Sequence, residues 1–322
     1  MNAREELIER ISQRRCESLP PLSEAAYQEL VNDVRSDLEN AVETESEQAL
    51  LLVAKALDRH NDARDGEDLL DDEAFLESRS TRMRRLVHDC EKILAVDETC
   101  LDARLLAVLA SDRGPDETLG PLLDLENYAN GLLGDSPFPA DAWDSVMLHP
   151  YMRVRAAVVR TCLDSARYRM ATSKGESALM MSASDPLGIR HSCALAYARL
   201  EDELGFESIE QQFPHMSGAW EHLAHAILLY KLGRMPAARR ALRGYVRLCE
   251  GGAYALLKPI MIDTYLPDRD FAPPFSFQEA TQAVHEADPI ICDVPDFISW
   301  AQSQRDIWFS AESFAQHFGF EW

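Results

Sequence analysis

Arginine spacing is the feature of this sequence that says most about possible chemistry. Arg153, Arg160 and Arg167 recur every seven residues, so in a helix all three would lie near one face. Planar guanidinium groups there could hold a carboxylate through paired hydrogen bonds. Two interpretations stay open. The arginines bind the carboxylates of a peptide, or Arg153 and Arg190 tie helix ends to nearby carbonyls or to acidic residues such as Asp164 and Glu201.

Histidine and cysteine residues form no recognisable catalytic or metal-binding motif. His222 and His225 would share a helix face, with His215 a short way before them, but no carboxylate or cysteine of suitable spacing completes a ligand set. The residues at 88–90 are His, Asp and Cys, yet adjacent helix positions do not face one another. Phosphate-loop, serine-elbow and zinc-protease motifs are missing as well. We therefore expect no catalytic residue, metal or cofactor, and a protein that is not an enzyme.

The charge of the chain is strongly negative and unevenly placed. Its 322 residues carry a net charge of −23, from 55 acidic and 32 basic side chains, which disfavours nucleic-acid binding. Residues 1–150 sum to −19, residues 151–250 to +4 and residues 251–322 to −8. On a second predicted helix Arg239, Arg243 and Arg247 recur every four residues. A basic centre could attract an acidic peptide or the chain's own ends, or the charges could simply form a solvated surface.

Cysteine usage and hydropathy indicate the compartment. Seven cysteines are scattered without a C-x-x-C pair, as in proteins of reducing compartments. The N-terminal ten residues are charged and amphipathic, without the apolar core of a signal peptide. Eighteen apolar residues nowhere run together, so we expect no membrane span and a cytoplasmic protein.

Apolar residues at helical spacing predict the elements that must position these side chains. The hydrophobic content of 46% and the low glycine content, 14 residues, favour a folded all-α protein. We expect N-terminal helices and an acidic linker over 1–80, helical repeats over 81–250 and a cap over 251–322. Ser23 is a candidate helix N-cap, residues 58–73 are expected to form a loop, and a helix is expected at about 116–132.

Three helix pairs can be laid over residues 150–183, 184–216 and 217–250. In this alignment Arg155, Arg190 and His222 fall at matching places, 35 and 32 residues apart. Tetratricopeptide repeats have a period of about 34 residues. Small residues such as Ala171 and Ala237 follow the turns of the first and third pairs, where two helices would pack closely.

The last 72 residues are rich in proline and hold 13 of the 26 aromatic residues. We expect an irregular crossing at about 258–275, then helices near 276–287 and 294–318. This segment either caps the apolar end of the repeat stack or folds into the groove of the stack and occupies it.

Residues 85–300 resemble a family of uncharacterised, mostly bacterial tetratricopeptide-like proteins. The run at 90–107, CEKILAVDETCLDARLLA, is similar to that family's ALEIDPDCLDAYLLLA, and 149–153, HPYMR, to its RPYMR box. Residues 185–190, DPLGIR, are similar to its NPNDNQGIR, although the polar stretch is shortened at Pro186 and Leu187. Tyr151, Arg153, Gly188 and Arg190 match the motif positions. The resemblance implies a right-handed α-α superhelix and no assigned activity.

In such a superhelix the first helix of each pair lines the concave groove. Arg153, Arg160, His191, Trp220 and Tyr230 would face that groove. We therefore expect a scaffold that binds a protein or peptide, in particular an acidic one, with neither nucleic acid nor membrane as partner. The alternatives are a self-assembling structural subunit, whose aromatic C-terminus docks on another copy, and a small-molecule site between the repeats and the tail.

Overall fold

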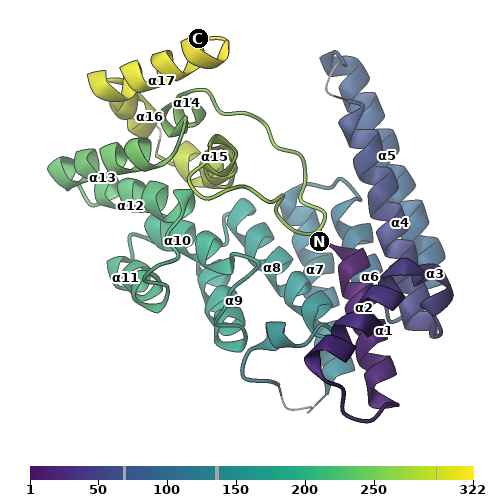
Figure 1. The fold of residues 1–322 in the computed structure, drawn as a ribbon. Helices are drawn as coiled ribbons and strands as arrows, with labels where there is room; N and C mark the ends of the chain where they lie inside the picture. The colour runs from purple at the N-terminus through teal and green to yellow at the C-terminus, as the bar shows by residue number, and fades with distance from the viewer. Residues whose placement is uncertain (68–69, 135–137, 295) are drawn as a thin grey trace. The chain divides into compact units, whose positions relative to one another are not determined.

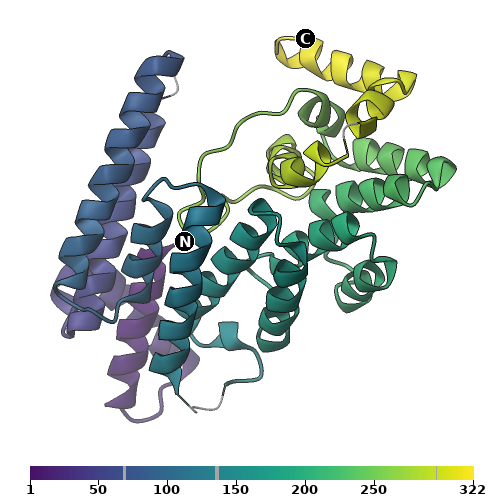
Figure 2. The same cartoon turned by 180° about the vertical axis from the view of Figure 1, so that it is seen from behind.

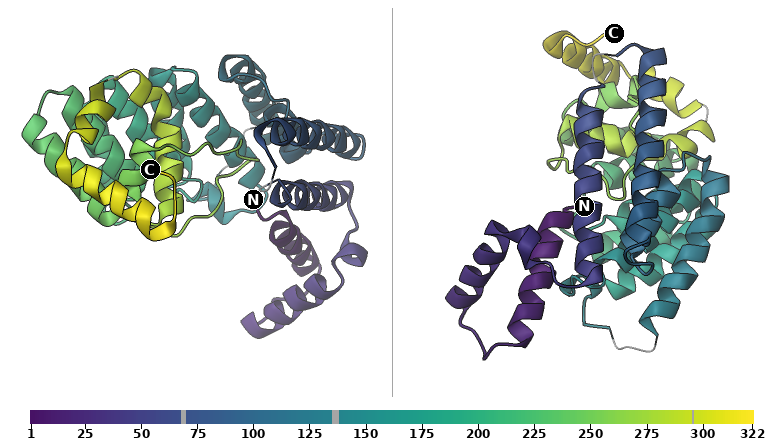
Figure 3. Two further views of the ribbon diagram at one scale, coloured as in Figure 1. Left: turned by 90° about the horizontal axis from the view of Figure 1, so that it is seen from above. Right: turned by 90° about the vertical axis from the view of Figure 1, so that its right-hand side faces the viewer.

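A computed structural model describes residues 1–67, 70–134, 138–294 and 296–322, and within these ranges all regular secondary structure is helical. The described residues form 17 α-helices and one 3-10 helix and no β-strand (Figure 1). The prediction of an all-α protein is confirmed. Many helices that follow one another along the chain pack against one another, such as α4 with α5 and α12 with α13, as Figures 2 and 3 show from other directions.

The chain divides into two compact units. The N-terminal unit contains Met1–Ala157 and the short segment Thr264–Asp268, and the C-terminal unit contains Val158–Asp263 and Arg269–Trp322. Helix α8, His149–Asp164, runs through the point of division.

Among its described residues the N-terminal unit contains seven further helices, and residues of the first six of them form one apolar core. They are α1 (Ala3–Glu17), α2 (Glu24–Ser36), α3 (Leu38–Ala41), α4 (Glu45–Asp65), α5 (Asp72–Leu94), α6 (Leu101–Leu109) and α7 (Pro115–Leu133), with the 3-10 turn at Ala142–Asp144. Leu7, Leu50 and Leu86 are fully buried in this core, and Leu266 packs against it from the far end of the chain. The long helices α4 and α5 run alongside each other (Figures 1 and 3).

Local signals set several helix ends as predicted, with one correction. Ser23 caps α2 by accepting a hydrogen bond from the amide of Ala26, and α7 confirms the helix expected at 116–132. The loop expected over 58–73 is wrong for residues 58–65, which belong to α4, and for residues 72 and 73, which begin α5. Val53, Leu57 and His60 are buried at helical spacing on one face of α4, so its acidic residues lie on the other faces and the helix continues. Residues 68 and 69 lie outside the described ranges.

The C-terminal unit continues with helices in pairs. These are α8 with α9 (Tyr168–Met181), α10 (Ile189–Leu200) with α11 (Glu203–Gln212), and α12 (Ala219–Lys231) with α13 (Met235–Leu248). Each of the segments 150–183, 184–216 and 217–250 thus holds two helices. Helix α10 packs on α9, α11 and α12, and α12 packs on α13.

A glycine permits a close contact between α9 and α10. At Gly175 of α9, an added Cβ would lie 2.2 Å from Cys193 Sγ of α10, well inside the normal contact distance. The absence of a side chain therefore allows α9 and α10 to approach at this point.

The chain after residue 250 forms four helices and an irregular crossing. Helix α14 (Gly252–Leu257) is followed by residues 258–276 without regular structure, as predicted, and then by α15 (Phe277–Cys292), α16 (Asp296–Gln302) and α17 (Arg305–Phe318). The single helix expected at 294–318 is therefore two helices, and residue 295 lies outside the described ranges. Tyr254 contacts Phe277, Phe314, Phe320 and Trp322 in an aromatic cluster.

Helix α15 packs against α10, α12 and α14. The C-terminal segment therefore covers the helices that carry the predicted groove residues His191 and Trp220, besides contributing to the aromatic cluster. In the described part of the chain, no helix combines the length and the apolar character that a membrane crossing requires.

Candidate functional site

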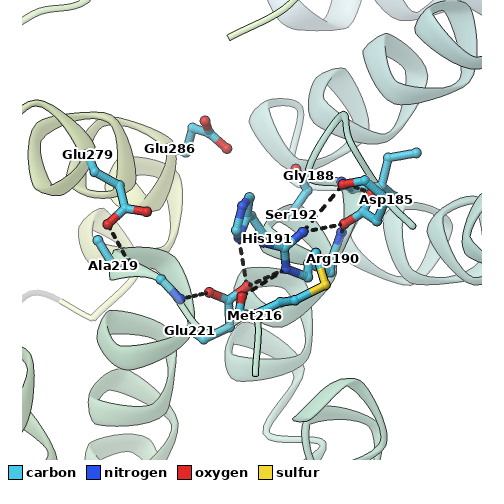
Figure 4. A network of polar contacts seen from close by, with 12 residues as sticks. Asp185, Gly188, Arg190, His191, Ser192, Met216, Ala219, Glu221, Glu279 and Glu286 are labelled. Carbon is cyan, nitrogen blue, oxygen red and sulfur yellow. Dashed lines mark hydrogen bonds and ion pairs between the residues drawn. The ribbon is translucent and has the colours of Figure 1, made fainter. Parts of the chain in front are cut away.

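A buried polar network lies at the N-terminus of α10 in the C-terminal unit (Figure 4). Asp185 caps this helix, because its carboxylate accepts hydrogen bonds from the amides of Ile189 and Arg190 at 2.7 and 3.1 Å. Gly188 adopts a left-handed conformation with φ of +64°, and a Cβ there would lie 2.5 Å from His191 Cδ2. The motif DPLGIR thus forms a turn that only glycine fits at its fourth position.

The ionic partners of this network come from the next helix pair. His191 Nδ1 lies 2.7 Å from Glu221 Oε1, and Glu221 Oε2 accepts a hydrogen bond from the amide of Gly218 at 2.8 Å. Burial opposes ionisation of Glu221, but the charges and hydrogen bonds of its neighbours lower its pKa to about 2. Arg190 donates to Asp185 at 2.9 Å and to the carbonyl of Met216 at 3.2 Å.

A second ion pair lies in the same unit. Arg269 donates two hydrogen bonds of 2.6 Å to Glu286 of α15, and it also donates to the Leu187 carbonyl and to Ser192 Oγ on the α10 side. Burial again opposes ionisation of Glu286, but Arg269 and then Arg160 lower its pKa. This arginine therefore joins the crossing segment, α10 and α15.

Two further carboxyl groups of this unit have raised pKa values. Burial raises the pKa of Glu279, which accepts hydrogen bonds from the amides of Phe275 and Ala219 at 2.6 and 3.3 Å. Asp164 lies at the end of α8 and reaches solvent. Even so, desolvation by the surrounding protein, and then the negative charge of Glu286, raise the pKa of its carboxyl group to about 7. Both groups bind protons more readily than an ordinary surface carboxyl.

The predicted groove residue Arg153 belongs instead to a buried cluster in the N-terminal unit. It is 1% exposed, and it donates to Asp102 at 2.9 and 3.0 Å and to Glu6 at 2.6 and 2.9 Å. Burial opposes ionisation of Glu6, but His149, 3.6 Å away, and the hydrogen bonds from Arg153 lower its pKa to about 2. Arg153 therefore ties α8 to α1 and α6, and its buried guanidinium offers no surface for a peptide.

The remaining predicted residues fall in different places. Tyr151 is buried, donates to Asn130 Oδ1 at 2.8 Å and accepts from Arg155 at 2.9 Å. Tyr230 packs beside Phe297 and Trp300 of α16. The structure thus brings together four of the predicted residues: Gly188, Arg190, His191 and Trp220. The ring of Trp220 stacks on that of His191, with the ring centres 4.2 Å apart. The charge of Arg160 acts on the nearby carboxyl groups of Glu286 and Asp164.

The histidine and cysteine candidates lie among apolar neighbours. The rings of His222 and His225 pack near Phe275 and Phe206, respectively. Burial raises the pKa of Cys90 to about 12, so this thiol stays protonated in the core. Across the described ranges, no group of three or more His, Cys, Asp or Glu side chains is placed to hold a metal ion.

The exposed face of α13 is a feature that residue spacing only partly indicated. Arg239, Arg240, Arg243 and Arg247 are exposed on this helix, while Ala238, Leu242 and Tyr245 are fully buried. From residue 222 to residue 249 the sequence contains no Asp or Glu but six Lys or Arg residues. A count of charge in short windows would have found this run in the sequence.

Helix α17 lies beside this arginine face. Arg243 pairs with Asp306 at 2.5 Å, and α13 packs against α17. Phe309, one helical turn after Asp306, is 50% exposed and carries the Arg305 guanidinium 5.3 Å from its ring centre. The two helices together present positive charge and an aromatic side chain to solvent.

Comparisons of this chain with models of protein families, with curated proteins and with solved structures found no match.

Proposed function

We propose that this chain is a non-catalytic helical-repeat scaffold of the tetratricopeptide type, which binds an acidic segment of a partner protein. The observation that carries the proposal is the exposed arginine face of α13, a helix that contains no Asp or Glu, on a chain of net charge −23. Throughout, this arginine face means Arg239, Arg240, Arg243 and Arg247.

The helix positions support the repeat assignment. The second helices of the three pairs begin at Tyr168, Glu203 and Met235, 35 and 32 residues apart. These intervals bracket the period of about 34 residues that tetratricopeptide repeats share. A right-handed α-α superhelix, in which each pair covers the apolar side of the pair before it, accounts for this regularity.

The arginine face, rather than the groove expected from the sequence, is the proposed docking surface. Helix α15 packs on α10 and α12, and His191 and Trp220 are both buried. The ionic side chains of those helices are already paired with one another, as His191 is with Glu221. A peptide would have to displace α15 to reach them, whereas the arginine face is exposed.

The size and charge of the arginine face suit a short extended segment. From Arg239 to Arg247 the helix rises about 12 Å, at about 1.5 Å per residue, which an extended peptide covers in about four residues. Each exposed ion pair contributes roughly 0.2–1 kcal/mol. Three such pairs give roughly 0.6–3 kcal/mol, which salt weakens because the Debye length is about 8 Å at physiological ionic strength. Phe309 adds an apolar contact, so the preferred segment combines carboxylates with an apolar anchor.

Fluorescence anisotropy of a short labelled peptide of Glu and Asp with one central Trp tests this proposal. The variant Arg239→Gln/Arg240→Gln/Arg247→Gln removes three charges and leaves the Arg243–Asp306 pair in place. We expect its affinity to fall by about threefold to about a hundredfold, and affinity for the wild-type protein to fall as salt is raised. The matched control is Arg84→Gln/Arg113→Gln/Arg169→Gln, three exposed arginines outside α13, which carries the same change in net charge.

The control separates a specific face from general electrostatic attraction. If both triple variants lose affinity equally, the arginine face is not the docking surface. Tighter binding of a single-stranded oligonucleotide or an anionic vesicle than of the peptide would also contradict the proposal, since either would assign the face to another class of partner.

Self-assembly is a second candidate, favoured by the exposed aromatic residues of α17. Phe309 and Phe318 are 50% and 51% exposed. Large apolar side chains grouped on a surface mark contact sites between proteins. Light scattering over a range of concentrations tests it: Phe309→Ser/Phe318→Ser should lower the average mass if copies of the chain dock there. A mass that does not depend on concentration in either protein excludes this candidate.

A further inference from the structure

A cavity lies between α4 and α5 of the N-terminal unit, away from the networks described above. Its volume is about 120 Å³. The basic side chains of Arg59, His60, Arg82 and Arg85 line it, together with the hydroxyl group of Thr81. Three arginines at one cavity are a marked concentration in residues 1–150, which sum to −19.

Two of these arginines are held in place by carboxylates. Arg82 is buried and donates to Glu67 at 3.0 and 2.8 Å, and its Nη1 lies 2.7 Å from His60 Nε2. Arg59 donates to Asp89 at 2.7 Å. These contacts fix both guanidinium groups before any ligand arrives, which reduces the entropy lost on binding.

The positive potential at the cavity is visible in the pKa of Asp89, the one carboxylate among its described lining residues. Burial would raise the pKa of Asp89, yet the pKa is lowered by the hydrogen bond from Arg59 and by the charges of Arg59, Lys92 and Arg85. The same field favours any other anion placed there. Arg85 is exposed and lines the cavity, in position to add a charge-assisted hydrogen bond to a ligand.

The volume limits the size of the ligand. A water molecule occupies about 30 Å³ in the liquid, so the cavity has room for about four waters or for a small ligand of about five to seven heavy atoms. A phosphate group and a short dicarboxylate both fit this limit. A phosphate group is tetrahedral and a carboxylate group is planar, and a guanidinium group can bind either one through two parallel hydrogen bonds.

We propose that the cavity between α4 and α5 is a binding site for a small oxyanion, held by Arg59 and Arg85 with Arg82 behind them. This site is independent of the docking surface on α13. The ligand is either a phosphate group, free or part of a small metabolite, or a short dicarboxylate.

Titration of the whole chain with inorganic phosphate and with malonate, which has seven heavy atoms, at constant ionic strength, tests the site. Phosphate binding is followed by ³¹P line width and malonate binding by proton saturation transfer, with isothermal calorimetry for affinity. We expect one of the two anions to bind in the millimolar range or tighter. Binding of phosphate alone identifies the phosphate class, and binding of malonate alone identifies the carboxylate class.

Variants locate the binding. Arg85→Gln removes an exposed side chain and should weaken binding about tenfold to about a hundredfold, and Arg85→Lys should restore part of it. Arg113→Gln, an exposed arginine of the same unit outside the cavity, should leave the affinity unchanged. Absence of binding by both anions overturns the proposal, and so does equal affinity in Arg85→Gln and Arg113→Gln.

Discussion

Replacement of Gly175 by alanine tests the close approach of α9 and α10. The new Cβ would lie 2.2 Å from Cys193 Sγ, where two such atoms in contact are about 3.5–4.0 Å apart. Cys193 is completely buried, so its thiol cannot move into solvent. Overpacking of this kind costs about 1–3 kcal/mol, and the better helix propensity of alanine returns about 1 kcal/mol. We therefore expect a net loss of up to about 2 kcal/mol in the free energy of unfolding.

The second variant that completes this test is Cys193→Ala. It removes the sulfur atom that the new Cβ would meet. The free energy of unfolding lost in Gly175→Ala/Cys193→Ala should therefore be smaller than the sum of the losses in the two single variants. The coupling should be about 1–3 kcal/mol, since the atoms touch directly. Gly244→Ala in α13 is the control: it meets nothing within 4 Å and should stabilise the protein by about 0.5–1 kcal/mol.

Urea unfolding followed by tryptophan fluorescence measures these differences. Four of the five tryptophans lie in the C-terminal unit, so the signal reports mainly on the unit that contains Gly175. The reasoning is refuted if Gly175→Ala is stabilised as much as Gly244→Ala. A coupling energy below about 0.5 kcal/mol would refute it too, because sites without contact add within that margin.

Three further predictions concern the buried polar groups. Arg153→Met should lower the free energy of unfolding by about 3–5 kcal/mol, measured by urea unfolding, because it leaves two carboxylates buried without their cation. Glu6 and Glu221 each have a pKa of about 2, against 4.5 in the unfolded chain. Their contribution to the free energy of unfolding is therefore present above pH 4.5 and is lost as the pH falls toward 2. Plots of the free energy of unfolding against pH should be flatter over this range for Glu6→Gln and for Glu221→Gln than for the wild type. Gly188→Ala should destabilise by about 1–3 kcal/mol in thermal unfolding, since its φ is +64° and the Cβ would strike His191.

The sequence predicts the helical character and much of the pairing in this chain because those features depend on local signals. Ser23 caps a helix through its own side chain, and prolines keep residues 258–276 free of helix. Such signals act over a few residues and can be read directly.

The partners of the buried arginines could not be predicted from spacing. Arg153 meets Asp102 and Glu6, which precede it by 51 and 147 residues. No local pattern distinguishes an arginine that binds a ligand from one that binds the protein's own carboxylates. The placement of α15 over α10 and α12 likewise depends on tertiary packing, and this packing covers the surface where the sequence suggested a groove.

In the acidic stretch after residue 57 the sequence predicted a loop where the structure has a helix. Its composition indicated a loop, yet α4 continues to Asp65 because the face carrying Leu57 and His60 is buried. Burial of one face outweighs the poor helix propensity of aspartate on the others. The extra turns of α4 form one wall of the proposed oxyanion cavity.

Arginine footprinting tests the proposed docking surface most directly. Phenylglyoxal modifies exposed guanidinium groups, and mass spectrometry reports each site separately with and without the acidic peptide. Protection of Arg239, Arg240 and Arg247, with Arg113 and Arg169 modified as before, is the result expected of a scaffold that binds through α13. Protection spread evenly over all five arginines, or none at all at saturating peptide, would contradict it.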